Sequence, residues 1–373
     1  MKYFSVPSDF KKETIDKYDA FNEKFIGNRI IETYGQLSHS DLGSGRAGDH
    51  IPIVSKKNMA KYIDYSLKKK IKFNYTLNST CLSNQEFSNR GALHLLKFIE
   101  ELYEMGIDTM TVALPSLMEL VKTSKYPIKI KASTVCHITN ADKALSYKKL
   151  GVDRIVVDES ANRDFGALKS IRNTFGDKVE LIVNVICYKN CIYRMFHHNQ
   201  MSHDISSNEK SVTYYSHRCM MKRCEKPSNL LRMNFIRPED LQHYVGIGIR
   251  YFKLQGRQAV QNGDIVESVK RYILEDYKGN LLDLLNCFSQ TNAFNVYLDN
   301  KKLKDFLLPF VKKIGFCTND CNTCKYCEDF IKQCVDIDDT KRIHEAAQIF
   351  YENFDQYTAN IKKLSKEIGD KSG

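Results

Sequence analysis

The sequence predicts an α/β protein: a (β/α)8 barrel of the TIM type, followed by a small, mostly helical module rich in cysteine. Between about residues 29 and 275, short β-rich runs alternate with segments of helical periodicity, as in a parallel sheet with helical crossovers. Eight such runs can be counted, and the rhythm ends near residue 280, ahead of a second group of cysteines. A doubly wound open sheet would show the same alternation, but eight strands each followed by a helix favour the barrel.

The expected strands are short runs rich in β-branched and aromatic residues. In chain order they are Arg29 to Gly35, Lys72 to Leu77, Thr109 to Ala113, Ile128 to Thr134, Arg154 to Val157, Glu180 to Ile186, Leu230 to Phe235 and Tyr251 to Leu254. They place the barrel in residues 1–280 and leave residues 281–373 for the C-terminal module.

Helices are expected between these strands, where apolar residues recur with helical spacing. They are Lys57 to Lys69, Gly91 to Met105, Ser116 to Lys122, Ala141 to Leu150, Phe165 to Phe175, Pro238 to Val245 and Ile265 to Asp276. Asn140 just before one helix and Pro238 in the first turn of another are typical helix-start signals.

Composition favours a cytoplasmic protein without membrane insertion. The N-terminus carries a charge every few residues, and no apolar run approaches the roughly 20 residues that span a bilayer. In a reducing compartment, clustered cysteines are expected to be metal ligands or redox groups rather than disulfides. The net charge of +11 is compatible with an anionic partner, RNA or a small molecule, although a solubilising lysine-rich surface is the preferred explanation of it.

Four of the twelve cysteines form a mid-chain group, Cys187, Cys191, Cys219 and Cys224, spaced C-x3-C and then C-x4-C. The first pair follows the sixth expected strand, and the second ends a long insertion, residues 192–228. Barrel enzymes carry their chemistry in the loops after the strands. Four thiolates suit a soft metal, so we expect a 4Fe-4S cluster here, with structural zinc or free core cysteines as alternatives.

A second, compact group follows in the C-terminal module. Cys317, Cys321, Cys324 and Cys327 have the spacing C-x3-C-x2-C-x2-C, with Cys334 as an alternate fourth ligand. Four cysteines within so short a stretch can wrap one cluster. We expect a second 4Fe-4S cluster that relays electrons to the barrel, or alternatively a zinc ion that pins the module.

Two basic residues lie at the end of the last expected strand. Arg257 lies just beyond it, where a guanidinium can hold a carboxylate or phosphate bidentately, and Lys253 lies within it. Both are candidate catalytic residues; a salt bridge that closes the barrel is the alternative. Asp158, Glu159 and Arg163, after the fifth expected strand, are expected to form a polar loop that caps the next helix.

An ordered set of motifs carries a resemblance to a known family. A cysteine pair after strand six, a second pair before strand seven, R-P-E-D-L at a helix start and a terminal F-K-L-Q-G-R occur in this order. In this set the chain resembles the peptidase U-32 (collagenase-like) family, whose barrel carries E-x-F-x-H-G-x-x-C, further cysteines that bind a 4Fe-4S cluster, and a strand ending in K-I-E-G-R. The matching stretches are Glu180 to Cys187 and Phe252 to Arg257. The His-Gly pair is absent, and Gln255 replaces the glutamate.

The resemblance implies an enzyme that uses its cluster for oxygen-independent hydroxylation, or a related redox modification, of an RNA base or small metabolite. Such chemistry implies an electron donor such as a ferredoxin or flavodoxin. The alternative is a peptidase of the same family, although the chain has neither H-E-x-x-H nor G-x-S-x-G. A non-catalytic RNA-binding protein that uses metal for shape is a third possibility.

A glycine-rich segment, Gly43 to Gly48, matches G-x-G-x-x-G. Asp49, His50 and Pro52 continue it as loop, where a dinucleotide site requires a helix to begin. We therefore expect a loop near the mouth of the barrel, with Arg46 available to an anionic substrate.

Overall fold

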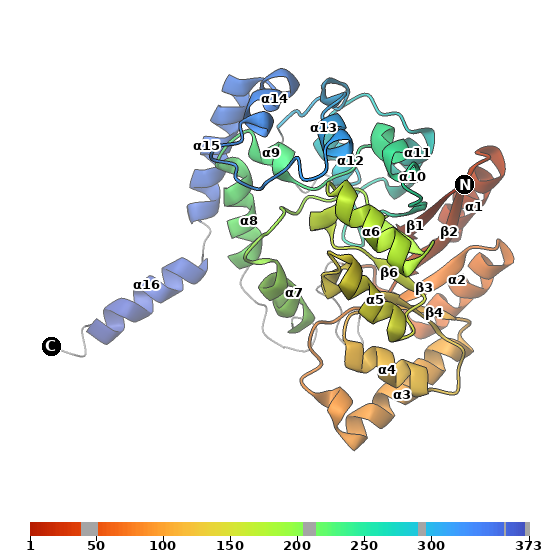
Figure 1. Cartoon of the computed structure of the whole chain (residues 1–373). Helices are drawn as coiled ribbons and strands as arrows, with labels where there is room; N and C mark the ends of the chain where they lie inside the picture. Colours follow the sequence, from red (N-terminus) through yellow and green to blue (C-terminus); the bar gives the residue numbers. More distant parts are fainter. Residues whose placement is uncertain (39–50, 204–213, 290–295, 354–355, 370–373) are drawn as a thin grey trace.

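The computed structural model describes residues 1–38, 51–203, 214–289, 296–353 and 356–369 (Figure 1). Its centre is a closed barrel of eight parallel strands that pair in chain order, with the last strand paired to the first. The strands are β1 Lys2–Pro7, β2 Asn28–Gly35, β3 Lys72–Leu77, β4 Thr109–Val112, β5 Lys129–Ala132, β6 Arg154–Val156, β7 Val179–Ile182 and β8 Tyr251–Lys253. The expected (β/α)8 fold class is confirmed; the expected loop at residues 43–48 lies outside the described residues.

Two strand assignments were wrong, and the errors cancel in the count. The barrel begins with β1, which the sequence analysis did not assign, although Phe4 and Val6 are fully buried in it. Leu230 to Phe235 is not a strand of the barrel: it forms the short helix α9, Asn229–Arg232, and an isolated antiparallel bridge from Met233 to Tyr188. A short buried apolar run looks the same in a helix and in a strand, so periodicity could not separate them.

The helices that surround the barrel agree with most expected positions. They are α1 Lys12–Lys24, α2 Lys56–Lys68, α3 Asn89–Glu104, α4 Pro115–Thr123, α5 Ala141–Lys149, α6 Phe165–Phe175, α10 Leu241–Val245 and α11 Ile265–Leu274. Side chains of Ser55, Ser88, Asn140 and Asp264 accept hydrogen bonds from the first turns of α2, α3, α5 and α11. Helix α1 was not expected, and Pro238–Asp240 forms a 3-10 turn before α10.

The insertion between β7 and β8 carries two further helices, α7 Arg194–His203 and α8 Tyr214–Cys224. The loop after β3 fastens α7, because the Thr80 hydroxyl donates to Asn199 (2.5 Å) and the Thr80 amide to the Ser202 hydroxyl (2.9 Å). The insertion is therefore attached to the carboxyl-terminal mouth of the barrel.

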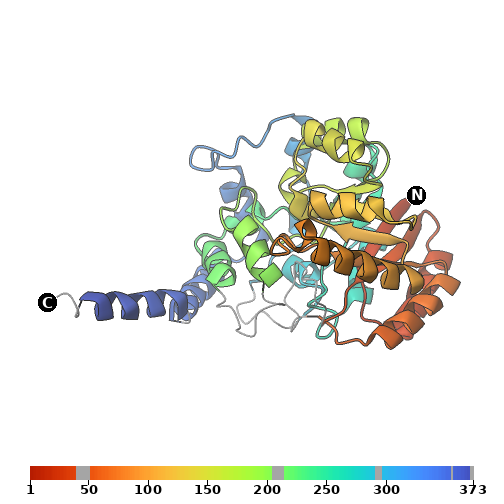
Figure 2. The same cartoon turned by 90° about the horizontal axis from the view of Figure 1, so that it is seen from below.

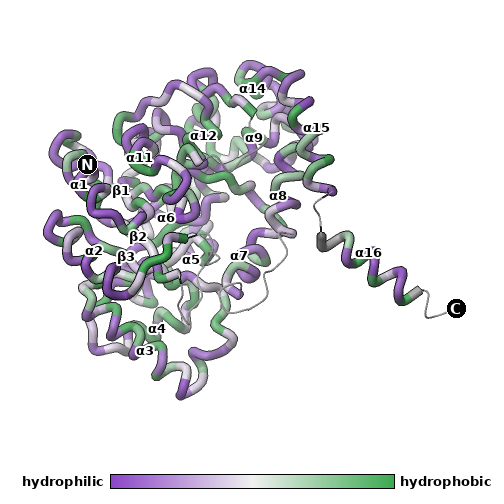
Figure 3. The backbone as a smooth tube through the Cα atoms, turned by 180° about the vertical axis from the view of Figure 1, so that it is seen from behind, coloured by the Kyte–Doolittle hydropathy of each residue, from purple (hydrophilic) through white to green (hydrophobic). Residues whose placement is uncertain are grey.

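The C-terminal part is helical. It comprises α12 Leu281–Leu285, α13 Leu308–Lys312, α14 Tyr326–Cys334, α15 Ile337–Asn353 and α16 Gln356–Gly369. Leu281, Phe306 and Ile331 are buried in the same apolar cluster as the barrel side chains. Helix α15 packs against α8, whereas α16 projects away from the body in two perpendicular views (Figures 1 and 2). Apolar and polar residues alternate along α16 (Figure 3).

The inside of the barrel holds a buried charge network. Lys131 on β5 lies 2.7 Å from Glu180 on β7 and also pairs with Glu32 on β2, which Arg154 approaches to 3.3 Å. Burial raises the pKa of Glu32, but the two cations outweigh it and lower that pKa to about 2. The lumen is therefore a place where charged groups are held without bulk water.

Candidate metal centre

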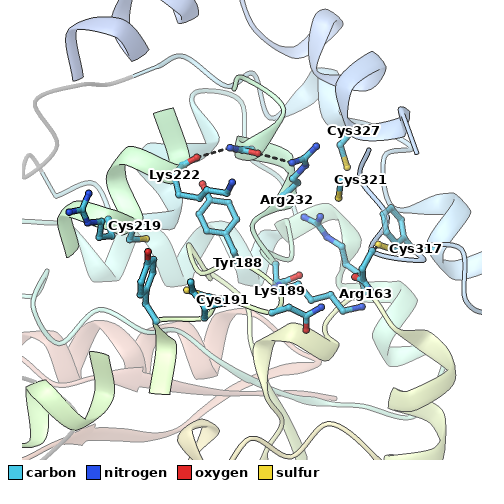
Figure 4. Close-up of a pocket in the computed structure, with 18 residues that line it drawn as sticks. Arg163, Tyr188, Lys189, Cys191, Cys219, Lys222, Arg232, Cys317, Cys321 and Cys327 are labelled. Carbon is cyan, nitrogen blue, oxygen red and sulfur yellow. Dashed lines mark hydrogen bonds between the residues drawn. The ribbon is translucent and has the colours of Figure 1, made fainter. Parts of the chain in front are cut away.

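The two cysteine groups open into one pocket of about 530 Å³. Cys191 and Cys219 lie on one side of it and Cys317, Cys321 and Cys327 on the other, with Tyr188 and Arg232 between them (Figure 4). The sequence had suggested two separate sites, one at the barrel mouth and one outside it. Barrel closure and the packing of the C-terminal helices bring the groups to a common space.

The mid-chain group is positioned by the exit from β7 and by α8. Cys187 lies in an extended segment whose carbonyl accepts a hydrogen bond from the Asn234 amide (3.1 Å), next to the bridge between Tyr188 and Met233. Cys219 and Cys224 lie on α8. Helix α15 covers this helix, and Gln348 donates to the Cys224 carbonyl (3.3 Å). The C-terminal part thus buttresses the mid-chain cysteines.

In the C-terminal group, Cys317, Cys321 and Cys324 lie in the connection between α13 and α14, and Cys327 lies in the first turn of α14. An aromatic cluster holds this region. The Tyr326 ring packs edge-on against Phe316 (5.1 Å between ring centres) and stacks on Phe306 (5.5 Å), and its hydroxyl donates to the Phe306 carbonyl (2.8 Å). Cys324 is exposed and does not line the pocket, while the buried Cys334 thiol donates to the Phe330 carbonyl (3.4 Å). Cys317, Cys321 and Cys327 are thus the members of this group that face the pocket.

The described residues contain no group of three or more cysteine, histidine or acidic side chains close enough together to hold a metal ion. The eight expected ligands therefore remain a prediction. The donor set fits a thiophilic group, because five thiols line the pocket together with five cationic side chains, and none of the lining residues is acidic. The cations are Arg163, Lys189, Arg218, Lys222 and Arg232.

Arg223 on α8 is buried and interacts with Cys219 and Cys224 of the mid-chain group. Burial lowers its pKa, but Cys219, Tyr188 and Cys224 outweigh this effect and raise it. Burial raises the pKa of both Cys219 and Cys224, and Arg223 opposes that rise. A guanidinium at this position would compensate the negative charge that four thiolates bring to a cluster.

Arg163 lies beside the C-terminal group, whereas it was expected in a polar loop that caps the next helix. Its guanidinium donates to the carbonyls of Leu231 (2.5 Å) and Met233 (2.6 Å) and lies 4.9 Å from the Phe306 ring centre. Burial raises the pKa of Cys327 to about 11, and Arg163 opposes this rise. Local sequence patterns could not predict this role, because the carbonyl partners of Arg163 lie about 70 residues away in the sequence.

Lys253 and Arg257 are both buried at the carboxyl end of β8, but neither lines the cysteine pocket. The Lys253 ammonium lies 4.0 Å from the ring centre of Tyr34. Burial lowers its pKa to about 7, and Lys131 and Arg257 add to the effect. Arg257 donates to the Gln36 side chain.

The turn between these two residues requires glycine at position 256. Gly256 has φ +144°, and a Cβ there would lie 3.0 Å from the Cys287 sulfur. Gln255, which replaces the glutamate of the family motif, donates from its side chain to the Asn184 carbonyl (2.9 Å). This glutamine therefore joins the ends of β7 and β8.

A histidine and an arginine that the sequence analysis did not select also lie at the mouth. His137, after β5, adopts a left-handed backbone (φ +52°), and its Nδ1 lies 2.6 Å from Asp158, after β6. Arg194 of α7 binds both Asp158 oxygens (2.5 and 2.6 Å) and lies 3.3 Å from Glu159. Burial raises the pKa of Asp158, but His137 and Arg194 outweigh it and hold that pKa well below its usual range. His137 follows β5 and Asp158 follows β6, so the position of His137 after a barrel strand could have identified it as a candidate site residue.

These features define a (β/α)8 barrel protein whose thiol-rich pocket and charged side chains gather at the carboxyl ends of the strands. The model of peptidase family U32 matches residues 52–278, and the chain belongs to this family. The expected family is confirmed. None of the helices in the described part of the chain combines the length and apolar character needed to cross a membrane.

The chain is similar to three known proteins. It is 29% identical over 339 residues to the uncharacterized protease MJ1657 of Methanocaldococcus jannaschii, covering 89% of this chain and 98% of that protein. It is 24% identical over 234 residues to the Escherichia coli 23S rRNA 5-hydroxycytidine C2501 synthase, covering 58% of this chain and 32% of that protein. The solved structure of the U32 peptidase Mk0906 aligns with a TM-score of 0.50 at 16% identity, covering 69% of this chain and 93% of that one, which supports the fold.

Proposed function

We propose that this protein is an iron-sulfur enzyme that hydroxylates, or otherwise modifies by redox chemistry, an RNA base or an anionic metabolite without molecular oxygen. The observation that carries the proposal is the pocket in which thiols from both cysteine groups meet five cations and no carboxylate. The name of the Escherichia coli relative, an rRNA hydroxycytidine synthase, supports this class of reaction.

In this proposal Cys187, Cys191, Cys219 and Cys224 hold one 4Fe-4S cluster. A second cluster, or alternatively zinc, is held by Cys317, Cys321, Cys324 and Cys327. Bound clusters would supply one-electron redox chemistry. Arg223 and Arg163 balance the negative charge of the two thiolate sets.

Replacing C–H by C–OH with oxygen from water releases two electrons and two protons. A carrier of the ferredoxin or flavodoxin type would then accept these two electrons from the protein. The His137–Asp158 pair can take up a proton at the barrel mouth, because Asp158 holds Nδ1 of the ring. Lys253 and Arg257 would hold an anionic group of the substrate within the barrel.

A peptidase is the alternative, supported by the names of the family and of the archaeal relative. The described contacts of His137 join it to Asp158 and Arg194 rather than to a serine or cysteine nucleophile. Peptide release that survives complete loss of iron would favour this alternative.

Anaerobic purification with iron, sulfide and zinc assays tests the metal content. About eight irons per chain are expected for two clusters and about four for one, and zinc alone would contradict the redox mechanism. Cys219→Ala and Cys321→Ala should each remove one cluster. Cys81→Ala is the matched control, because Cys81 is half-buried and belongs to neither group.

The substrate is tested by comparing the masses of ribonucleosides and metabolites in cells with and without the gene. We expect a product that is heavier by one oxygen in cells that carry the gene. This product should be absent from cells without the gene and from cells that carry only the Cys219→Ala variant. Unchanged masses in both pools would contradict a hydroxylase.

A further inference from the structure

A second cavity, of about 340 Å³, lies at the amino-terminal ends of the strands, the end opposite to the carboxyl ends that lead to the cysteine pocket. Parallel strands all start at this end, so the residues that begin them converge. Lys72, Lys129, Arg154 and Tyr251 are the first residues of β3, β5, β6 and β8, and Lys178 directly precedes β7. Lysine or arginine at successive strand starts thus builds one basic cavity.

The cavity is lined by six cationic side chains and two carboxylates. The cations are Lys70, Lys72, Lys129, Lys131, Arg154 and Lys178, and the carboxylates are Glu32 and Asp153. Both carboxylates are already engaged. Lys131 and Arg154 pair with Glu32, while Asp153 accepts from the Ile130 amide (2.9 Å) and from Lys122 (3.5 Å).

Three of the cations have no counter-charge within the described residues. Lys70, Lys129 and Lys178 are exposed, and none of them forms an ion pair with another described side chain. Lys70 also holds a left-handed backbone, φ +57°, which few non-glycine residues adopt. Like charges around one cavity repel each other unless an anion lies between them.

The wall of the cavity is pre-organised. The rings of Tyr3 and Tyr251 stack with centres 4.8 Å apart, and the Arg154 guanidinium lies 4.6 Å from the Tyr251 ring centre. Glu32 holds the same guanidinium from inside the barrel (3.3 Å). A fixed arginine fork next to exposed lysine ammonium groups is a typical arrangement for recognising phosphate oxygens.

We propose that the amino-terminal end of this barrel binds a small phosphate-type polyanion. The volume suits a small ligand. Three uncompensated ammonium groups favour a ligand with at least two negative charges over a single carboxylate. The site is independent of the proposed redox function, since the amino end of a barrel serves stability rather than catalysis. Its ligand would therefore stabilise the barrel by relieving the lysine repulsion.

Calorimetric titration of the full chain with inorganic pyrophosphate, at constant ionic strength, tests the proposal. One pyrophosphate per chain and a rise in melting temperature are expected. The double variant Lys129→Gln, Lys178→Gln should weaken binding at least tenfold. The control is Lys57→Gln, Lys169→Gln, which removes two exposed lysines from α2 and α6 and should change affinity less than twofold.

No pyrophosphate binding, or equal weakening in both double variants, would overturn the proposal, because net charge alone would then explain any effect. A short RNA in a second titration distinguishes the source of the phosphate. If pyrophosphate displaces the RNA from both the unaltered protein and the control variant, the ligand is RNA phosphate. If the double variant Lys129→Gln, Lys178→Gln loses pyrophosphate binding but still binds RNA normally, the natural ligand is a free phosphate compound.

Discussion

Arg194 in the insertion binds both carboxylate oxygens of Asp158, 36 residues earlier in the chain, at 2.5 and 2.6 Å. This contact fastens α7, which follows the first mid-chain cysteine pair, to the carboxyl end of β6. Both side chains are largely buried. The geometry of the cysteine pocket therefore depends on an ion pair that belongs to the barrel mouth.

Arg194→Met should release the insertion. Asp158 keeps His137 but loses its guanidinium, and breaking a buried ion pair typically costs about 3–5 kcal/mol, so we expect a lower midpoint in urea unfolding. Limited proteolysis should cut residues 192–228 faster than in the unaltered protein. Arg342→Met, which removes an exposed arginine paired with Asp339 on α15, is the control and should leave both measurements almost unchanged. Equal effects of the two variants would contradict the role of Arg194.

Lys131→Met should destabilise the barrel strongly. It leaves Glu180 without its buried cation at 2.7 Å and also removes one partner of Glu32. Loss of about 3–5 kcal/mol in the free energy of unfolding is expected. The exposed pair of Lys68 and Asp64 on α2 offers the comparison, and Lys68→Met should have little effect. A stability close to that of the unaltered protein would show that the lumen admits compensating water.

Lys253→Met should stabilise the protein most at low pH. The pKa of Lys253 is about 7 in the folded chain against 10.5 for an ordinary lysine, so between these values the unfolded chain binds the extra proton and stability rises with pH. Below pH 7 both states carry the charge, and the folded state bears the full cost of burying it, an upper limit of about 5 kcal/mol. Urea unfolding at several pH values should show the advantage of the variant shrinking as the pH rises. A constant difference would contradict the lowered pKa, and Lys169→Met is the control.

Arg163→Leu should lower the metal content of the C-terminal group and leave that of the mid-chain group intact. It removes the cation near Cys327 and leaves the carbonyls of Leu231 and Met233 without their donor. Metal per chain should approach the value for Cys321→Ala. The Arg163→Lys variant keeps the positive charge but not the forked guanidinium. Its metal content per chain should lie between those of the unaltered protein and Arg163→Leu. Full metal content in Arg163→Leu would show that this arginine supports packing alone.

Sequence patterns predicted the barrel and most of its helices, because side-chain periodicity and helix-start residues are local properties. They failed at β1 and at residues 230–235, where both segments are short and mostly buried. Only pairing with β2 and β8 distinguishes β1 from another buried run. The position of Lys253 inside the barrel likewise depends on the closure of β8 against β1.

The sequence by itself determined the fold class, the family resemblance and the two groups of cysteines, since these are recorded in the order and spacing of residues. The tertiary structure alone decided that Cys191 and Cys219 share a pocket with Cys317, Cys321 and Cys327, and that Arg163 lies half-buried beside Cys327. Contacts between segments so far apart in the sequence arise from barrel closure and helix packing, which local sequence patterns do not encode.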